Sequence, residues 1–509
     1  DLQKIVTERR ASHFMGSVVS QVTGSGAMTE HQIIDGQQRI TTVTLLLLAM
    51  ANMVKARKIA SQRGEILYDQ IMETYVIDKF ARPEDQIKLR LIKSDREDLA
   101  KIVARDTSDP SSNLTINYNF FCEELLKGSP TVDDMYDALG RLQIISITLE
   151  RNDNAQLIFE SLNSTGLALE EGDKIRNYIL MDLTPREQET YYTEYWEKIE
   201  KYTSGKTSRF VRDYISVKTQ VTPTISTVYK AFKEYREKYN IPLQELLEDM
   251  KKYAAIYSRL ISGKSGLNDQ ELDDCMYRLN RLDVTVTMPF FMEVLCLNQD
   301  GGKLSTHDVK QIFLITETYL FRRNICEVPT NALNKIFLNL NREILRYENN
   351  TDHYVDKFIY ALYSKKESGR FPDDDEFKQA LSTKAIYQMR GKYKEYLFER
   401  FENYGTRETK DVYTLLDNGT YSIEHIMPQS LSTTWNKALG DNAKEIHDTW
   451  LHRLGNLTLT AYNPEMSNKS FTEKRDAEHG YRHSGLRMNQ ELAKKEKLTS
   501  DVLSEYTQV

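Results

Sequence analysis

The chain has 509 residues, too many for one hydrophobic core, so two to four domains are expected. Its composition, 40% hydrophobic and 28% charged, is that of a globular protein, and its longest apolar run, residues 43–54, is too short to span a bilayer. The net charge of −7 excludes a strongly basic coat protein for nucleic acids, but leaves room for a local basic groove. Four scattered cysteines without a CxxC pair indicate no disulfide framework, which predicts a cytoplasmic protein without a membrane partner.

In chain order, the first informative stretch is IIDGQQRITT, residues 33–42, which predicts a short strand and turn before a long helix over 41–58. Gly36 permits a tight turn and close approach of the backbone to a ligand. Arg39 offers a fork of donors that suits phosphate. Thr41 is expected at the start of the helix, where free amides and the helix dipole favour an anion. No Walker-type loop precedes this stretch, and a polar turn that caps the helix is the simpler structural interpretation.

Two more segments of the N-terminal part have recognisable patterns. Residues 142–149 predict a strand and residues 154–163 predict a helix that stops at Ser-Thr-Gly. FESLNSTGLALEEGDKIRNYIL, residues 159–180, adds a second motif to DGQQR. Together the two motifs resemble the ParB/sulfiredoxin-like α/β domain that accompanies GmrSD-type nucleases, which binds and often hydrolyses nucleoside triphosphates and helps to sense modified DNA.

By this resemblance, a nucleotide site would be formed by Asp35, Gln37, Gln38 and Arg39, and lined or supported by Asn163, Asp173, Arg176 and Asn177. Gly36 and Thr41 are added to the expected site by the turn and the helix start described above. Domains of this family also carry a Tyr-Gln-Arg stretch upstream of DGQQR. The present sequence begins too late to show that stretch, so the chain is expected to be incomplete at its N-terminus.

The middle of the chain, residues 186–385, has helical spacing almost throughout, interrupted by polar loops that contain glycine or proline. It predicts an all-helical scaffold, and its sequence indicates no particular catalytic or binding function. The expected domains are therefore residues 1–185, 186–385 and 386–509, in an α+β fold that is mostly helical.

In the last domain, a predicted helix over 393–404 leads to IEHIMPQS, residues 423–430, then HRLGNLTLT, residues 452–460, and a predicted helix over 463–475. Hydrolysis of a phosphodiester needs a base to activate water and a cation to neutralise charge on the phosphate. Histidine suits the first task, and carboxylate and amide oxygens suit Mg²⁺ or Mn²⁺ in the second. Zinc is disfavoured because the domain contains no cysteine.

These three segments resemble the ββα-metal (His-Me finger, HNH) nuclease domain of the GmrSD-type, Type IV modification-dependent restriction endonucleases. By that resemblance, His425 would be the general base and Glu424 an acid of the metal site. Asn456 would orient the base, and His452 would contact phosphate or support the site. A final metal ligand would come from the third segment, with Asn463 favoured and Asn468 as its competitor.

The resulting hypothesis is a nucleotide-dependent endonuclease that cleaves modified double-stranded phage DNA in antiviral defence. It would use Mg²⁺ or Mn²⁺ and a nucleoside triphosphate, and a homodimer would let two sites cut both strands. Two alternatives stay open. One is a nucleotide-gated DNA-binding switch with an inactive nuclease domain, and the other is a nuclease directed at RNA.

Overall fold

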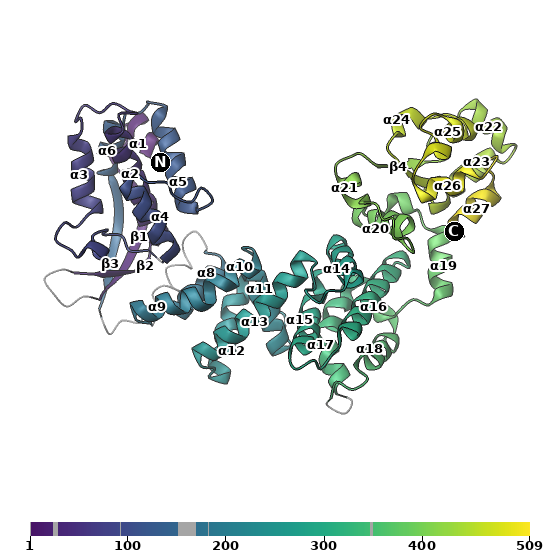
Figure 1. Cartoon of the computed structure of the whole chain (residues 1–509), viewed down its shortest axis with the longest axis horizontal. Helices are drawn as coiled ribbons and strands as arrows, with labels where there is room; N and C mark the ends of the chain where they lie inside the picture. The colour runs from purple at the N-terminus through teal and green to yellow at the C-terminus, as the bar shows by residue number, and fades with distance from the viewer. Residues whose placement is uncertain are drawn as a thin grey trace. The chain divides into compact units, whose positions relative to one another are not determined.

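The computed structural model describes residues 2–23, 29–91, 93–150, 169–181, 183–346 and 350–508. Within these ranges the fold is mostly helical, with three strands in the N-terminal part and two near the C-terminal end (Figure 1). The chain divides into two compact units, residues 1–198 and 199–509. None of the helices in the described ranges is long and apolar enough to cross a membrane.

The first unit contains a three-stranded mixed sheet. β1 (His13–Val22) lies in the centre, antiparallel to β2 (His31–Asp35) and parallel to β3 (Leu142–Leu149). A parallel pair requires a long crossover, and the helices between β2 and β3 supply it. The register of β1 against β3 shifts next to Gly16, which has a φ of 107° and marks a bulge.

Helix α2 (Gln37–Lys55) is the centre of the first unit's core. Residues 45–54 are all buried, because this stretch is apolar except for Asn52, whose Nδ2 donates to the carbonyl of Ile102. Around it lie leucines and aromatic residues of the other helices. The helices around α2 are α1 (Leu2–Thr7), α3 (Ile66–Ile71), α4 (Lys93–Ala104), α5 (Asn113–Leu126) and α6 (Val132–Leu139). Two more helices, α8 (Glu171–Leu180) and α9 (Pro185–Tyr191), follow the sheet in the chain.

The second unit begins with helices that are packed through apolar faces. Short loops with left-handed residues separate several of them: Gly263, with a φ of 67°, ends α13. The helices are α10 (Glu197–Thr203, which crosses the boundary between the units), α11 (Thr207–Thr219), α12 (Val228–Tyr239), α13 (Leu243–Ser262), α14 (Gln270–Leu282), α15 (Met288–Gln299), α16 (Thr306–Ile325), α17 (Leu333–Leu345), α18 (Tyr354–Tyr363) and α19 (Asp374–Thr383).

The C-terminal part of the second unit surrounds a two-stranded sheet. Its core is continuous with α14 and α16, because Leu282 and Phe321 pack in the same cluster as Ile426 and Leu457. The elements are α20 (Gly391–Asn403), α21 (Val412–Asp417), β4 (Ser422–His425), α22 (Thr433–Leu439), α23 (Ala443–Trp450), β5 (Leu457–Thr460), α24 (Asn463–Met466), α25 (Phe471–Asp476), α26 (Arg487–Ala493) and α27 (Ser500–Gln508).

The predicted strand over 142–149 is confirmed as β3, and the predicted helix over 393–404 is confirmed as α20. Between 186 and 385 the described residues contain helices and no strand, as expected. The predicted helix over 154–163 lies outside the described residues. The division of the second unit into a scaffold and a nuclease domain stays a prediction, since both parts share one core.

Candidate active site

The C-terminal sheet brings the histidine motif and the Gly-Asn-Leu motif side by side. β4 runs antiparallel to β5, with Glu424 opposite Thr458 and His425 opposite Leu457. All four residues are buried. Because successive side chains of a strand point to opposite faces, Glu424 and His425 meet different neighbours from adjacent positions.

His425 is buried, with 6% of its surface exposed. Its Nε2 atom has no hydrogen-bond partner among the described residues. The side-chain amide of Gln429 lies 3.4 Å from Nδ1, at the edge of hydrogen-bonding distance. Buried polar atoms are usually paired, so an unpartnered ring nitrogen needs an explanation. A general base would present this atom to a water molecule.

Two further rings surround the His425 imidazole. The ring centroid of Tyr387 lies 4.3 Å from that of His425 and 5.6 Å from that of His452, to which it is nearly parallel. The two imidazole centroids are 5.6 Å apart, and Nδ1 of His452 is also buried without a partner among the described residues. The fold therefore brings the two predicted histidines together. It adds Tyr387, from the turn before α20, which no local pattern singles out.

The electrostatic surroundings keep His425 neutral. Burial is the largest cause, and together with the nearby His452, Lys474 and His447 it lowers the pKa of His425 from 6.5 to about 4. An imidazole with this pKa carries no charge at neutral pH. It can therefore accept a proton there.

Asn456 holds the loop that follows His425. Its Oδ1 accepts a hydrogen bond from the backbone N–H of Met427 at 2.7 Å, and its Nδ2 donates to the carbonyls of Met427 and Leu451 at 3.0 and 3.1 Å. The N–H of Ile426 donates to the carbonyl of Asn456 at 2.9 Å. Asn456 is completely buried. These contacts reach His425 through the backbone, so any orienting effect of Asn456 on the base is indirect.

Glu424 is paired with Lys474, which α25 contributes. The Lys474 ammonium donates to the Glu424 carboxylate and, at 2.8 Å, to the carbonyl of His425. The two side chains are only 0% and 4% exposed. Burial raises the pKa of Glu424, and the Lys474 ammonium offsets part of that rise. Nothing in the local sequence marks Lys474, because a lysine in a short polar helix is ordinary.

The two asparagines of the third segment occupy different places. Asn463 begins α24, and its Nδ2 donates to Ser422 Oγ at 3.0 Å and to the carbonyl of Ile423 at 3.3 Å. Asn468 is exposed in the turn between α24 and α25. The prediction of one helix over 463–475 is wrong, since Ser467 has a φ of 39° and divides it in two. The role of either asparagine as a metal ligand stays a prediction.

One residue of the site, Glu424, is suited to holding a divalent cation. The Glu424 carboxylate is the kind of hard oxygen donor that Mg²⁺ and Mn²⁺ prefer, and it lies beside His425 in the chain. The described residues contain no group of three His, Cys, Asp or Glu side chains that is able to hold a metal. The other ligands would therefore be amides, water and substrate phosphate. Lys474 already supplies a cation at this carboxylate.

In the first unit, Gly36 joins β2 directly to α2. Its φ of 94° is left-handed, and the helix begins at the next residue, Gln37. The prediction that the helix starts at Thr41 is therefore wrong: Thr41 lies in the second turn, and its hydroxyl donates to the carbonyl of Gln37 at 2.9 Å. The free amides of the helix N-terminus belong to Gln37, Gln38 and Arg39 instead.

Arg39 connects α2 to strands β1 and β2. Its Nη1 donates to the carbonyl of Ser17 at 2.6 Å and lies 3.4 Å from Asp35 Oδ2. A Cβ atom at Gly16 would lie 3.0 Å from Arg39 Nε, so the glycine at the bulge of β1 makes room for the guanidinium. In this conformation Arg39 Nη1 is engaged within the protein, so contact with a phosphate would use the other N–H donors of the guanidinium.

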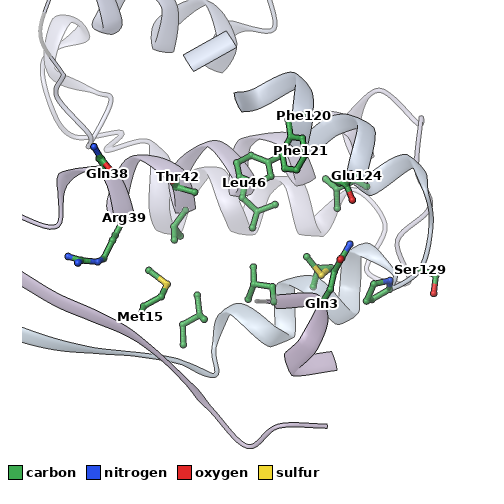
Figure 2. Close-up of a pocket in the computed structure, with 16 residues that line it drawn as sticks. Gln3, Met15, Gln38, Arg39, Thr42, Leu46, Phe120, Phe121, Glu124 and Ser129 are labelled. Atoms are coloured by element: carbon green, nitrogen blue, oxygen red, sulfur yellow. The ribbon is translucent and has the colours of Figure 1, made fainter. Parts of the chain in front are cut away.

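A cavity of about 500 Å³ lies beside the first turns of α2 (Figure 2). Gln38, Arg39 and Thr42 line it from α2, and Phe120 and Phe121 line it from α5. Figure 2 shows Arg39 extending away from the two aromatic rings. The wall is mainly apolar, so the cavity suits a base or another flat apolar group better than a triphosphate.

Three other residues expected at the nucleotide site, Asp173, Arg176 and Asn177, lie in α8. Arg176 Nη2 lies 2.9 Å from Asp173 Oδ1, one turn earlier in the helix. The carbonyl of Asn177 accepts a backbone hydrogen bond from Met181. Asn163 lies outside the described residues. Whether these four residues contribute to a nucleotide site stays a prediction.

Comparison with known families covers both ends of the chain. Residues 1–180 match the N-terminal domain of GmrSD restriction endonucleases, and residues 371–508 match their C-terminal domain. No curated protein matches the chain. The DGQQR motif lies inside the first range, and the histidine cluster lies inside the second. The chain therefore belongs to the GmrSD restriction endonucleases.

Proposed function

We propose that this chain is a Type IV endonuclease that hydrolyses phosphodiesters of modified double-stranded phage DNA, with a nucleoside triphosphate controlling the cut. One observation carries the catalytic part of the proposal. The neutral imidazole of His425 is buried, and its Nε2 has no partner among the described residues. Such a group beside a carboxylate is suited to activating water.

In this mechanism, Nε2 of His425 takes a proton from the water whose oxygen bonds to phosphorus. The P–O bond on the far side breaks, and the leaving ester oxygen takes a proton from solvent. A bound phosphate is anionic and would raise the pKa of His425 towards the operating pH, which improves a base. Nδ1 of His452, which has no partner among the described residues, lies in the same cluster and would contact a phosphate oxygen. A divalent cation held by Glu424 would neutralise charge on the phosphate.

The test is nicking of plasmid DNA that carries or lacks modified bases, with Mg²⁺ or Mn²⁺, with and without EDTA. His425→Ala should abolish nicking and leave the folded structure intact. His479→Ala is the matched control, because His479 is a half-exposed histidine of the same unit that stacks on Tyr462. Full nicking by His425→Ala would overturn the catalytic assignment.

The nucleotide part of the proposal rests on the N-terminus of α2. Its free amides and helix dipole favour an anion, and the neighbouring cavity has room for a base. Gln38 is exposed and lines the cavity. Gln38→Ala should weaken nucleoside triphosphate binding in calorimetry, whereas Gln143→Ala, at an exposed position of β3, should not. Equal affinities for the two variants would exclude this pocket.

A second candidate function is a nucleotide-gated DNA-binding switch with an inactive nuclease site. The ion pair between Glu424 and Lys474 favours it, because the carboxylate is already neutralised without a metal. Slower migration of modified DNA on a native gel, without nicking in Mn²⁺, would support the switch. A parallel assay with RNA of the same sequence would reveal an RNA-directed nuclease.

A further inference from the structure

The ion pair between Glu424 and Lys474 lies at the centre of the nuclease site. Lys474 reaches it from α25, fifty residues along the chain from β4. The same ammonium donates to the carbonyl of His425. One cation therefore contacts both residues of the Glu-His pair. It lies at the carboxylate that the proposed function assigns to a divalent metal.

Both members of the pair are sealed from solvent, with side-chain exposures of 0% and 4%. Removing one partner from such a pair leaves an uncompensated buried charge, which is strongly unfavourable. The Glu424 carboxylate is therefore anionic only when a cation accompanies it. A divalent metal and the Lys474 ammonium are alternative ways to meet this requirement, and like charges a few ångströms apart repel strongly in a buried site.

We propose that Lys474 is a tethered cation that neutralises Glu424 in the metal-free protein and competes with a divalent metal for its carboxylate. The inference rests on the proposed nuclease function, in that it takes Glu424 as the residue that holds the metal. When the metal binds, the ammonium leaves the carboxylate. The flexible four-carbon stem of lysine permits this without unfolding α25.

Two consequences follow for the metal-free and metal-bound protein. Metal binding is weakened because the ion pair between Lys474 and Glu424 must be broken. The site therefore binds little metal when the metal concentration is low. Loss of the ammonium leaves a carboxylate that only a metal or a proton can neutralise. A variant without Lys474 should therefore be destabilised in EDTA and regain stability in Mn²⁺, since a ligand that binds only the folded state stabilises it.

The experiment uses the full chain and Mn²⁺ alone, with affinity measured by calorimetry or by electron paramagnetic resonance of free Mn²⁺. Lys474→Gln should bind Mn²⁺ at least about tenfold more tightly than the wild type, because a competing charge has been removed. Its melting temperature should rise more on addition of Mn²⁺ than that of the wild type. Lys469→Gln is the matched control, because it removes an equal charge from an exposed side chain just before α25.

Unchanged or weaker Mn²⁺ binding by Lys474→Gln would overturn the inference, as would wild-type Mn²⁺ affinity in Glu424→Gln. If Lys474→Gln does not fold in EDTA, Lys474→Arg provides the second test, because it keeps the cation and should bind Mn²⁺ no more tightly than the wild type. Tighter binding by Lys474→Arg would contradict the competition. These measurements need no DNA, so they remain separate from the nicking assay of His425→Ala.

Discussion

The ring of Tyr387 covers the imidazole of His425, with their centroids 4.3 Å apart. The same ring stacks on His452, and its backbone N–H donates to the carbonyl of His452 at 3.1 Å. Lys394 lies 4.9 Å from the centre of the Tyr387 ring. A residue from outside both motif strands thus helps to enclose the candidate base and fix its distance from the second histidine.

Tyr387→Ala should expose His425 to water. Because burial is the largest cause of its low pKa, that pKa should rise from about 4 towards 6.5. The acid limb of the nicking rate against pH should move upward accordingly, and the maximal rate should fall by roughly tenfold as the rings lose their alignment. Tyr387→Phe keeps the ring and should retain the wild-type profile. Superimposable profiles for the wild type and Tyr387→Ala would show that the ring does not control the base.

His425 should make the stability of the second unit depend on pH. Its pKa is about 4 in the folded chain and 6.5 when unperturbed, so between these values the unfolded chain binds the extra proton. Stability therefore falls as the pH drops from 6.5 to about 4, by up to about 3 kcal/mol from this residue. Urea unfolding followed by tryptophan fluorescence measures it, with Trp435 buried in the same core.

The control for this measurement is His425→Gln, which removes the titrating group. Protonation of carboxylates also lowers stability in this pH range. The expected signal is therefore the difference between the wild type and the variant, which should grow above pH 4 and level off above pH 6.5. A difference that is constant with pH would contradict a depressed pKa for His425.

Asn456→Ala should destabilise the loop after His425. The variant leaves the buried N–H of Met427 without its acceptor and two carbonyls without their donor. A buried group that loses its partner costs about 1–3 kcal/mol. Nicking should fall with stability. Asn436→Ala is the matched control, because Asn436 is exposed and bonds only within its own helix in the contacts described. Thermal unfolding that is equal for both variants would refute this role.

Gly455→Ala should disturb the packing of α27 on the Gly-Asn-Leu turn. A Cβ atom at Gly455 would overlap the carbonyl of Leu503 and lie 2.5 Å from Thr507 Oγ1, so the backbone of α27 has to move. We expect a loss of about 3 kcal/mol in the free energy of unfolding. Gly485→Ala meets no atom within 4 Å and should be nearly neutral. Similar melting temperatures for the two variants would show that α27 can shift at little cost in the free energy of unfolding.

Local sequence accounts for much of the C-terminal sheet. The β-rich spacing of the Gly-Asn-Leu segment and the strand before Pro428 predict two short strands, and these pair as β4 and β5. The association of His425 with His452 follows from that pairing and the turn before β5. In contrast, Lys474 and Tyr387 approach the Glu-His pair across long stretches of chain, and neither belongs to a periodic pattern of its own.

The N-terminal motif shows a similar limit. The turn at Gly36 follows from the preference of glycine for left-handed backbone, but the exact start of α2 depends on β2 ending against β1. The internal bonds of Arg39 to Ser17 and Asp35 arise from the pairing of two strands and a bulge. A sequence pattern identifies a donor that suits phosphate. It does not reveal whether the folded chain has already used that donor.

By itself, the sequence determined the chemistry that the chain can offer: a histidine beside an acid, an asparagine before a β-rich segment, and a glycine turn before an apolar helix. These features depend on residue type and short spacing, which act locally. Only the tertiary structure decided that His425 is buried and neutral under Tyr387, and that Glu424 carries Lys474 in place of a free carboxylate. Burial and charge pairing depend on which distant segments meet, and short spacing does not encode those meetings.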